Sequence, residues 1–251
     1  MAVAGGRARP TIAQRLLASA ARAPIDLRSL LPAEVLAQGP RPLCVPFALS
    51  TGHEALRASE NAGKVEALAP EALWWSCTRR GQTGATGVLL SDVGLALADT
   101  GQPALDDWPF DDSLGPGTED PPAGAGPAPW LKADLRAIPL AHDGIEDEVE
   151  DWLSRGTPVG LVIEVTQEFE FPDSHGHIST PSMTVGPGEY HAVVAVGVAT
   201  HQAHGRRLLI RNSWGAGWGL GGYGWLPLAY LQSFAVQACV VVAPGSEGNQ
   251  G

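Results

Sequence analysis

The spacing of apolar residues changes about halfway along the chain, and the predicted secondary structure changes with it. In the first half, apolar and small residues recur every three to four positions, which is the period of an amphipathic helix. In the second half, short apolar runs bounded by Gly and Pro are typical of strands. Helices are predicted at 44–60, 70–80, 91–99 and 144–155, and strands at 159–165, 191–198, 208–211, 222–226 and 235–242.

Two of these helices have recognisable start signals. Pro70 lies where a first-turn proline is favoured, and Ser91-Asp92 is expected to cap the third helix. The stretch 101–129 is rich in Pro, Gly and Asp and predicts a long surface connection.

This order of elements predicts an α+β protein with two unlike lobes. We expect a flexible leader over 1–24, a helical lobe over 25–135, a β-rich lobe over 136–243 and a flexible tail over 244–251. A chain of 251 residues with 44% hydrophobic residues can bury a sizeable core.

Charge and composition exclude some classes of partner. The formal net charge of −11 argues against nucleic acid and anionic membranes, because both attract basic surfaces. The sequence contains no run of 18 apolar residues, so no membrane-spanning helix is expected. We therefore expect neither a nucleic-acid nor a membrane partner.

Three distant residues have the chemistry of a thiol-dependent active site. A thiol attacks carbonyls as the thiolate, so Cys44 would need a base, and that base would need a group to orient it. His191 and Asn212 fit these roles, because they stand at the start of one predicted strand and the end of another. Gln38, six residues before Cys44, is a candidate donor to the oxyanion of a tetrahedral intermediate.

The segments around these residues resemble those of papain-like cysteine peptidases. That family has a Gln-Gly pair six residues before its nucleophile, as in Gln38-Gly39, and an apolar strand that begins with the catalytic His. The run 211–219, Arg-Asn-Ser-Trp-Gly-Ala-Gly-Trp-Gly, is the most specific match. The order Cys, His, Asn and the Cys-to-His spacing of roughly 130–150 residues also agree with the family.

The resemblance implies both a fold and an activity. The fold would have a helical lobe and an antiparallel, β-barrel-like lobe, with the active-site cleft between them. The activity would be hydrolysis of peptide bonds through an acyl-enzyme, with Cys44 as nucleophile, His191 as base, Asn212 as orienting residue and Gln38 in the oxyanion hole. Trp214 would shield the Asn–His hydrogen bond from water. The substrate would be a peptide or protein, and no cofactor or metal is expected.

The chain also departs from the family pattern. Secreted members carry a disulfide cysteine three residues before the nucleophile, where this chain has Arg41. The residue after the nucleophile is usually a large aromatic and here is Val45. The family's Cys-Asn-Gly-Gly segment, which binds substrate backbone, is absent, and the glycines of 81–87 are expected in its place.

Cysteine usage bears on the compartment. With Cys44 as a free nucleophile, a disulfide would have to join Cys77 and Cys239, which we instead expect to be buried in a helix and a strand. Few cysteines suit a reducing compartment, so we expect a cytoplasmic protein, with secretion as the alternative.

The amino-terminal segment allows two interpretations. Residues 1–24 contain four arginines and no acid, and they are expected to form a flexible leader, with a targeting segment as the alternative. Residues 25–28 resemble the start of a mature domain, so a prokaryote-type member without a long propeptide is expected. This expectation leaves an inhibitor or regulatory partner open as a restraint on the activity.

Two other functions on the same scaffold are alternatives to a peptidase. An acyl transferase or amidase that processes one peptide would suit the altered cleft, whereas a non-catalytic binding module would need none of the four active-site residues. His175 and His177 have a spacing that can ligate a metal, but with no third ligand nearby in sequence they predict a surface or cleft loop.

Overall fold

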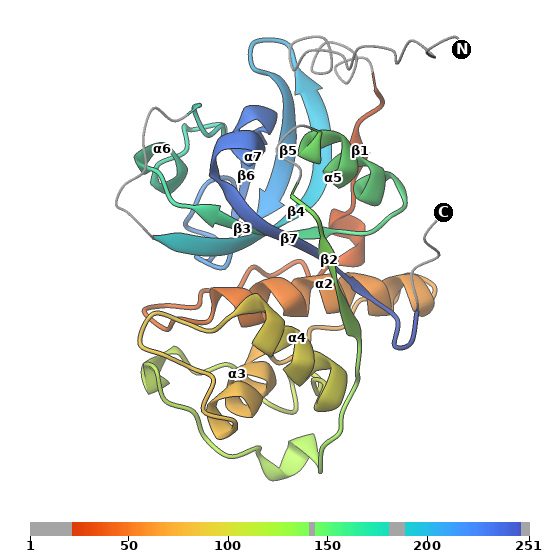
Figure 1. The fold of residues 1–251 in the computed structure, drawn as a ribbon, viewed down its shortest axis with the longest axis vertical. Helices are drawn as coiled ribbons and strands as arrows, with labels where there is room; N and C mark the ends of the chain where they lie inside the picture. The colour runs from red at the N-terminus through yellow and green to blue at the C-terminus, as the bar shows by residue number, and fades with distance from the viewer. Residues whose placement is uncertain (1–21, 141–143, 181–188, 247–251) are drawn as a thin grey trace, which may run out of the picture.

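The computed structural model describes residues 22–140, 144–180 and 189–246 and shows a helical lobe packed against a β-rich lobe (Figure 1). The helical lobe contains α2 (Cys44–Glu60), α3 (Pro70–Arg79), α4 (Leu90–Asp99) and the 3-10 turns η1 (Arg28–Leu30), η2 (Asp112–Leu114) and η3 (Ala123–Ala125). The strands are β1 (Ile25–Asp26), β2 (Asp134–Ile138), β3 (Val159–Glu164), β4 (Tyr190–His201), β5 (Gly205–Arg211), β6 (Tyr223–Pro227) and β7 (Ala235–Val242). The helices of the β-rich lobe are α5 (Ile145–Ser154), α6 (Gln167–Glu170) and α7 (Leu228–Phe234).

The helices and strands predicted from periodicity are present, most of them within a few residues of the predicted bounds. The predicted cap of the third helix is wrong. Helix α4 begins at Leu90 with no side-chain cap, and Asp92 instead accepts a hydrogen bond from the Gln82 side chain. The pattern did not reveal β1, β2, α6 or α7, which are short or lie at the sheet edge, where alternation is weak.

The strands form one antiparallel sheet in the order β2-β7-β3-β4-β5-β6, with β1 paired to β4. The lobe boundary expected after residue 135 falls inside β2, whose pairing with β7 places the whole strand in the sheet. Strand β1 can approach β4 closely because Gly197 has no Cβ, which would lie 2.5 Å from the Ile25 carbonyl oxygen. The β-rich lobe therefore contains both the first strand of the described residues, β1, and the last, β7.

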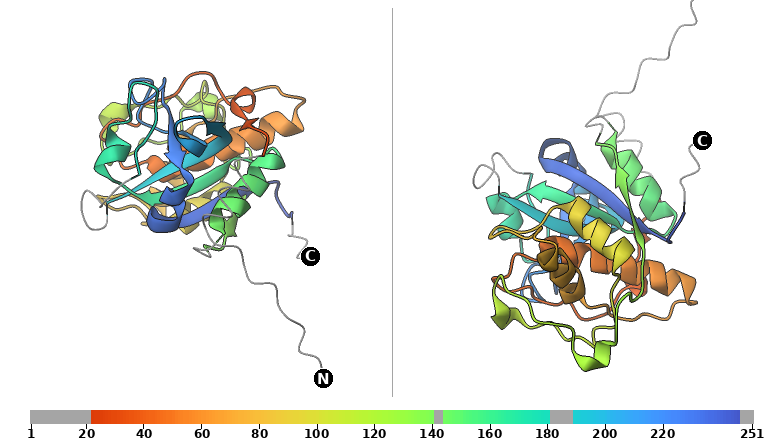
Figure 2. Two further views of the ribbon diagram at one scale, coloured as in Figure 1. Left: turned by 90° about the horizontal axis from the view of Figure 1, so that it is seen from above. Right: turned by 60° about the horizontal axis from the view of Figure 1, so that its bottom comes forward.

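Both faces of the central strand β4 are buried. Its residues 192, 194 and 196 belong to the core shared with α2, and residues 193, 195 and 198 belong to the core shared with α5 and α7. Figure 2 shows the sheet from two further directions, with helices on either side. A strand covered on both faces needs a continuous apolar run, and this explains the sequence Ala-Val-Val-Ala-Val-Gly after His191.

Helix α2 packs closely against the sheet. Gly52 lies in the middle of the helix, and a Cβ there would come within 2.8 Å of the Val241 side chain in β7. The glycine costs helix propensity but lets the helix approach the sheet. This packing places the first residue of α2, Cys44, next to the start of β4.

The connection over 101–129 is not simply a surface loop. Trp108 is completely buried, and its ring lies 6.1 Å from Trp75 and 5.8 Å from Trp130 between centroids. The third pair, Trp75 and Trp130, is also 6.1 Å apart, so the three indoles form a closed triangle of edge contacts. This triangle fastens the long connection to α3.

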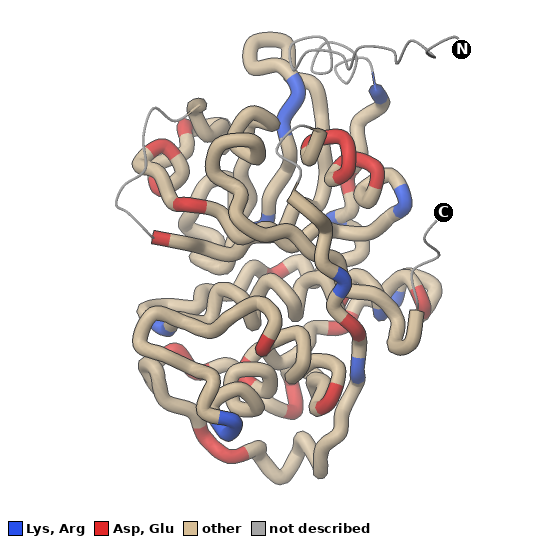
Figure 3. Tube along the Cα trace, in the orientation of Figure 1, with Lys and Arg blue, Asp and Glu red and all other residues tan. Residues whose placement is uncertain are grey.

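Acidic residues are distributed over both lobes, with a concentration on α5 (Figure 3). Within the described residues, no helix has the length and apolar character required to cross a bilayer.

Replacing Trp108 with Ala should destabilise the protein by about 3–5 kcal/mol, because the substitution opens a cavity that two other indoles line. Urea denaturation followed by circular dichroism measures this change. The exposed Leu95→Ala variant is the control and should change stability by less than about 0.5 kcal/mol. A loss below about 1 kcal/mol for Trp108→Ala would mean that the triangle does not fasten the connection.

Candidate active site

The β4–β5 hairpin brings His191 and Asn212 together. Val194 pairs with Arg211 across the hairpin, so residues just before Val194 and just after Arg211 lie at the same end. At that end, His191 Nε2 lies 2.7 Å from Asn212 Oδ1. Both side chains are buried, which protects the hydrogen bond from competition with water.

The hydrogen bonds of Asn212 fix the tautomer of the imidazole. The oxygen Oδ1 accepts a second hydrogen bond from the backbone N–H of Ser213, at 2.8 Å, which identifies this atom as the carbonyl oxygen of the amide. His191 Nε2 must therefore be the protonated nitrogen and the donor. The other ring nitrogen, Nδ1, is left as the basic one.

Aromatic residues surround the His191 ring. Trp214 lies 4.7 Å from it between centroids, and Phe169 lies 6.0 Å away. Burial lowers the pKa of His191 to about 4, against the smaller opposing effect of its hydrogen bond to Asn212. In the resting protein the imidazole is thus neutral at pH 7.

Cys44 is the first residue of α2, at a helix start that no side chain caps. Backbone N–H groups of Ala192, Val45 and Cys44 itself interact with the thiol and lower its pKa, as expected at a helix N-terminus. Burial has the larger effect, and the net pKa of Cys44 is raised. Among the described residues, no hydrogen bond joins this thiol to the His191 ring, although both residues line the same groove.

The Gln38 amide is held from two sides. Its Oε1 accepts a hydrogen bond from Ser213 Oγ at 2.6 Å, and its Nε2 donates to the Arg41 carbonyl oxygen at 2.7 Å. Because an amide nitrogen carries two hydrogens, one remains available to another acceptor. The backbone N–H of Gln38 also donates to the Ser213 carbonyl, which joins the loop before Cys44 to the residue after Asn212.

A groove of about 440 Å³ runs between the lobes past Cys44 and His191. One wall comes from the helical lobe, with Gly87, Val88 and Leu89, and the opposite wall comes from the sheet. The sheet wall contains Val162, Tyr190, Ala192 and Val236. The size and the largely apolar lining suit one or two side chains of a bound ligand.

A sequence model of papain family cysteine proteases matches residues 53–241. The match covers more than half of the 251-residue chain. The chain belongs to the papain family of cysteine proteases. It is accordingly a peptidase, and the resemblance found in its motifs is confirmed.

Solved structures show that this papain-family chain also has the papain-like fold. Xylellain, a cysteine protease from Xylella fastidiosa, is 23% identical, with a TM-score of 0.69 over 92% of this chain and 89% of that one. Digestive procathepsin L 3 of the Tenebrio molitor larval midgut is 20% identical, with a TM-score of 0.69 over 88% of this chain and 70% of that one.

The ragweed pollen allergen Amb a 11, a cysteine protease whose structure is of the proform, is 21% identical, with a TM-score of 0.68 over 88% of this chain and 66% of that one. No curated protein matches the chain in sequence. The two-lobed α+β prediction is confirmed by these likenesses. The family match includes His191 and Asn212 but begins after Gln38 and Cys44, whose assignment depends on their motif and their position beside the groove.

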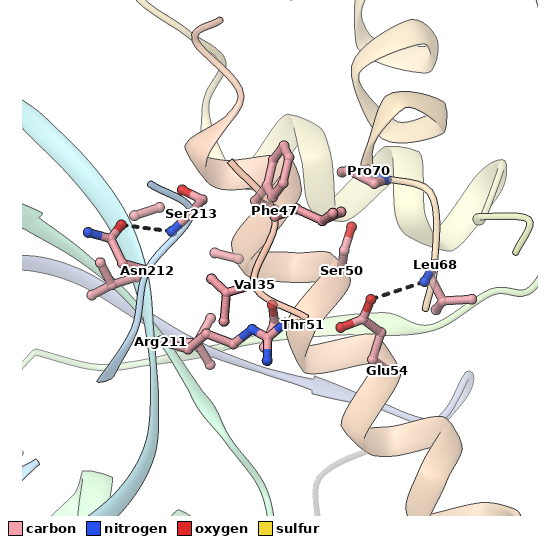
Figure 4. Close-up of a pocket in the computed structure, with 15 residues that line it drawn as sticks. Val35, Phe47, Ser50, Thr51, Glu54, Leu68, Pro70, Arg211, Asn212 and Ser213 are labelled. Carbon is pink, nitrogen blue, oxygen red and sulfur yellow. Dashed lines mark hydrogen bonds between the residues drawn. The ribbon is translucent and has the colours of Figure 1, made fainter. Parts of the chain in front are cut away.

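Beside Asn212, the peptidase contains a small cavity with a buried carboxyl group. The cavity has a volume of about 30 Å³, roughly that of a water molecule. Figure 4 shows the Arg211 guanidinium and the Glu54 carboxyl directed into the space beside Thr51. Burial raises the pKa of Glu54 to about 7, while the hydrogen bond from the Leu68 N–H and the charge of Arg211 oppose this shift.

The structure groups three histidines that the sequence did not connect. The His177 ring stacks on His204 at 4.0 Å and meets His201 edge-on at 4.7 Å between centroids. His175, two residues before His177, is exposed in the same loop. Nowhere in the ranges 22–140, 144–180 and 189–246 are three or more His, Cys, Asp or Glu side chains arranged to hold a metal ion.

Sequence reasoning missed Ser213 and the contacts of Arg41. Ser213 was visible inside the Asn-Ser-Trp motif, but only the structure shows that it links Asn212 to Gln38. Arg41 departs from the family pattern, and its buried partners come from segments far away in sequence. Cys77 and Cys239 are both free and buried, as expected.

The buried carboxyl predicts a pH-dependent difference between the wild type and Glu54→Gln. The folded-state pKa of about 7 lies above the ordinary value of 4.5, so the wild type loses stability as pH rises from 4.5 through 7. The uncharged Gln keeps the acceptor for Leu68 and avoids this loss. Relative to the wild type, Glu54→Gln should gain about 2–3 kcal/mol between pH 5 and pH 8.5 in urea denaturation.

The exposed Glu66→Gln variant is the control and should show no such pH-dependent gain. A stability difference between Glu54→Gln and the wild type that stays constant from pH 5 to pH 8.5 would contradict the raised pKa of Glu54.

Proposed function

We propose that this papain-family peptidase hydrolyses peptide bonds with Cys44 as nucleophile, His191 as general base and Asn212 as the residue that orients the base. The observation that carries the proposal is the Asn212 hydrogen-bond pattern, because it leaves the basic Nδ1 of His191 available for the thiol proton.

The first step is transfer of the Cys44 proton to His191 Nδ1. Burial alone disfavours both charged forms, since it raises the pKa of the thiol and lowers that of the imidazole. Transfer within the pair creates both charges side by side, so their attraction offsets the desolvation cost of each. The backbone N–H groups of Ala192 and Val45 stabilise the thiolate further. A bound substrate would tighten the contact, as is common for catalytic hydrogen bonds.

The thiolate then attacks the peptide carbonyl and forms a tetrahedral intermediate. The free Nε2 hydrogen of Gln38 and the backbone N–H of Cys44 would donate to its oxyanion, and one such donor is typically worth about 3 kcal/mol. His191 returns the proton to the leaving amine, which leaves an acyl group on the Cys44 sulfur. Water, deprotonated by His191, releases the carboxylic acid and restores the thiol.

The groove suits a substrate with an apolar side chain near the scissile bond. Leu89, Tyr190 and Val236 remain 38–66% exposed around it, so a ligand would cover apolar surface that the protein itself leaves open. Gly87 lies in the same groove and allows a peptide backbone to approach closely. No specific observation favours the acyl transferase or the non-catalytic binding module over hydrolysis.

An irreversible epoxide peptide probe should label Cys44 and neither of the other cysteines. Cys77 and Cys239 are buried, and burial raises the pKa of each thiol to about 12, so neither forms a nucleophilic thiolate. Mass spectrometry of the labelled protein identifies the site, and Cys44→Ala should lose both the label and the hydrolysis of an unfolded protein substrate. Labelling elsewhere, or hydrolysis retained by Cys44→Ala, would refute the proposed nucleophile.

The apolar groove predicts that Val236→Glu shifts the substrate preference. A carboxylate in the groove wall should favour a peptide with Arg over one with Leu, and the ratio of the two kcat/KM values should rise about tenfold or more. Leu95→Glu adds the same charge at an exposed apolar position outside the groove and serves as the matched control. If both variants keep the wild-type ratio, the groove does not hold the substrate side chain that is varied between Arg and Leu.

A further inference from the structure

Arg41, in the loop between Gln38 and Cys44, is a completely buried cation with every donor used. Its two terminal nitrogens bind the Glu71 carboxylate of α3, and neither side chain has any exposed surface. The remaining bonds reach backbone carbonyls of the 111–117 segment, namely those of Asp111, Gly115 and Gly117. All five N–H groups of the guanidinium are therefore satisfied.

Glu71 is held as firmly as its partner. Its Oε1 accepts a further hydrogen bond from Thr118 Oγ1 at 2.9 Å. The Arg41 guanidinium also lies over the Phe110 ring, 5.0 Å from the centroid. Two charges without access to water are costly to bury, and an apolar pair of similar volume often gives equal or greater stability. The arrangement is better explained by the geometry that it imposes than by its contribution to stability.

That geometry reaches the active site through the Arg41 backbone. The Arg41 carbonyl accepts hydrogen bonds from Gln38 Nε2 at 2.7 Å and from the Leu43 N–H at 2.9 Å. Ser213 holds the other end of the Gln38 amide. A displacement of the Arg41 backbone would therefore rotate or release the amide that the proposed mechanism places at the oxyanion.

We propose that Arg41 is a positioning residue for the oxyanion hole. Its side chain, clamped between Glu71 and the 111–117 carbonyls, fixes the backbone carbonyl that orients Gln38. This inference rests on the proposed function, in which Gln38 stabilises the tetrahedral intermediate. In this proposal the clamp acts through Gln38, and the reactivity of the Cys44 thiol tests whether the Cys44–His191 pair is affected as well.

The first test compares Arg41→Met with Arg206→Met. Arg206 and Glu150 form a second buried ion pair, with side chains 2% and 3% exposed. Arg206 pairs with Thr200 near the turn of the β4–β5 hairpin, at the opposite end of β4 from His191. In Arg41→Met, kcat for a peptide substrate should fall about 100-fold, as for loss of one oxyanion donor, while KM changes by less than about threefold. Arg206→Met should keep the wild-type kcat.

Alkylation by iodoacetamide tests the Cys44 thiolate separately from the oxyanion hole. The reaction needs the thiolate but no oxyanion donor. The alkylation rate of Cys44 should change by less than about threefold in Arg41→Met. Should this variant not fold, Arg41→Lys and Glu71→Gln take its place. Lys retains the charge but not the forked hydrogen bonds, so Arg41→Lys should keep only part of the wild-type kcat.

A double-mutant cycle with Gln38→Ala decides whether Arg41 acts through Gln38. In the Gln38→Ala background, Arg41→Met should lower kcat by less than about threefold further, because the residue that it positions is already absent. A full 100-fold further loss, an equal loss in Arg206→Met, or an equal loss of the alkylation rate would overturn the proposal.

Failure of the proposed function gives a different result. If the wild type alkylates at Cys44 but cleaves no peptide, the peptidase mechanism fails, and the clamp is judged by NMR of the Gln38 side-chain amide. Its resonances should shift in Arg41→Met and not in Arg206→Met. Unshifted Gln38 resonances in Arg41→Met would overturn the clamp whatever the activity.

Discussion

The packing of α2 across β4 is the constraint on which the site depends. Apolar residues of the helix and alternate residues of the strand share one core, and Gly52 allows the helix to approach β7. This contact places the start of α2 beside the start of β4, so Cys44 and Ala192 line the same groove. A shift of the helix by one turn would move Cys44 by about 5 Å and separate it from the strand end.

The β4–β5 hairpin supplies the second half of the arrangement. Antiparallel pairing places His191 and Asn212 at one end, and Ser213 then connects Asn212 to Gln38. The loop before Cys44 is thus attached to the β-rich lobe through Ser213 and to the helical lobe through Arg41 and Glu71. Two independent attachments at a single loop would preorganise the proposed oxyanion hole and so lower the reorganisation needed when charge develops.

Much of this could be predicted from the sequence, because local patterns carry it. The helix at 44–60 follows from its apolar period, and the long apolar run after His191 follows from a strand buried on both faces. The family likeness follows from the run 211–219, whose Trp and Gly spacing is specific. Cys77 and Cys239 could be expected in the core from their apolar neighbours alone.

The rest depends on contacts between distant segments. Arg41 stands where secreted relatives carry a bridging cysteine, but its partner Glu71 and the 111–117 carbonyls cannot be read from local spacing. Trp108 looked like part of a surface loop because Pro, Gly and Asp surround it, whereas two distant indoles bury it. Likewise, a helix start predicts a lowered thiol pKa, and only the surrounding burial shows that the net effect on Cys44 is the opposite.

The most direct test of the central claim is cross-linking with a three-carbon dihaloketone, which can join a thiol to an imidazole only when the two groups are adjacent. If α2 packs across β4 as described, the reagent should alkylate Cys44 first and then His191, and peptide mass spectrometry should recover the two peptides joined at these residues. A protein alkylated at Cys44 in which His191 remains unmodified, or in which the second arm reaches another residue, would contradict the account.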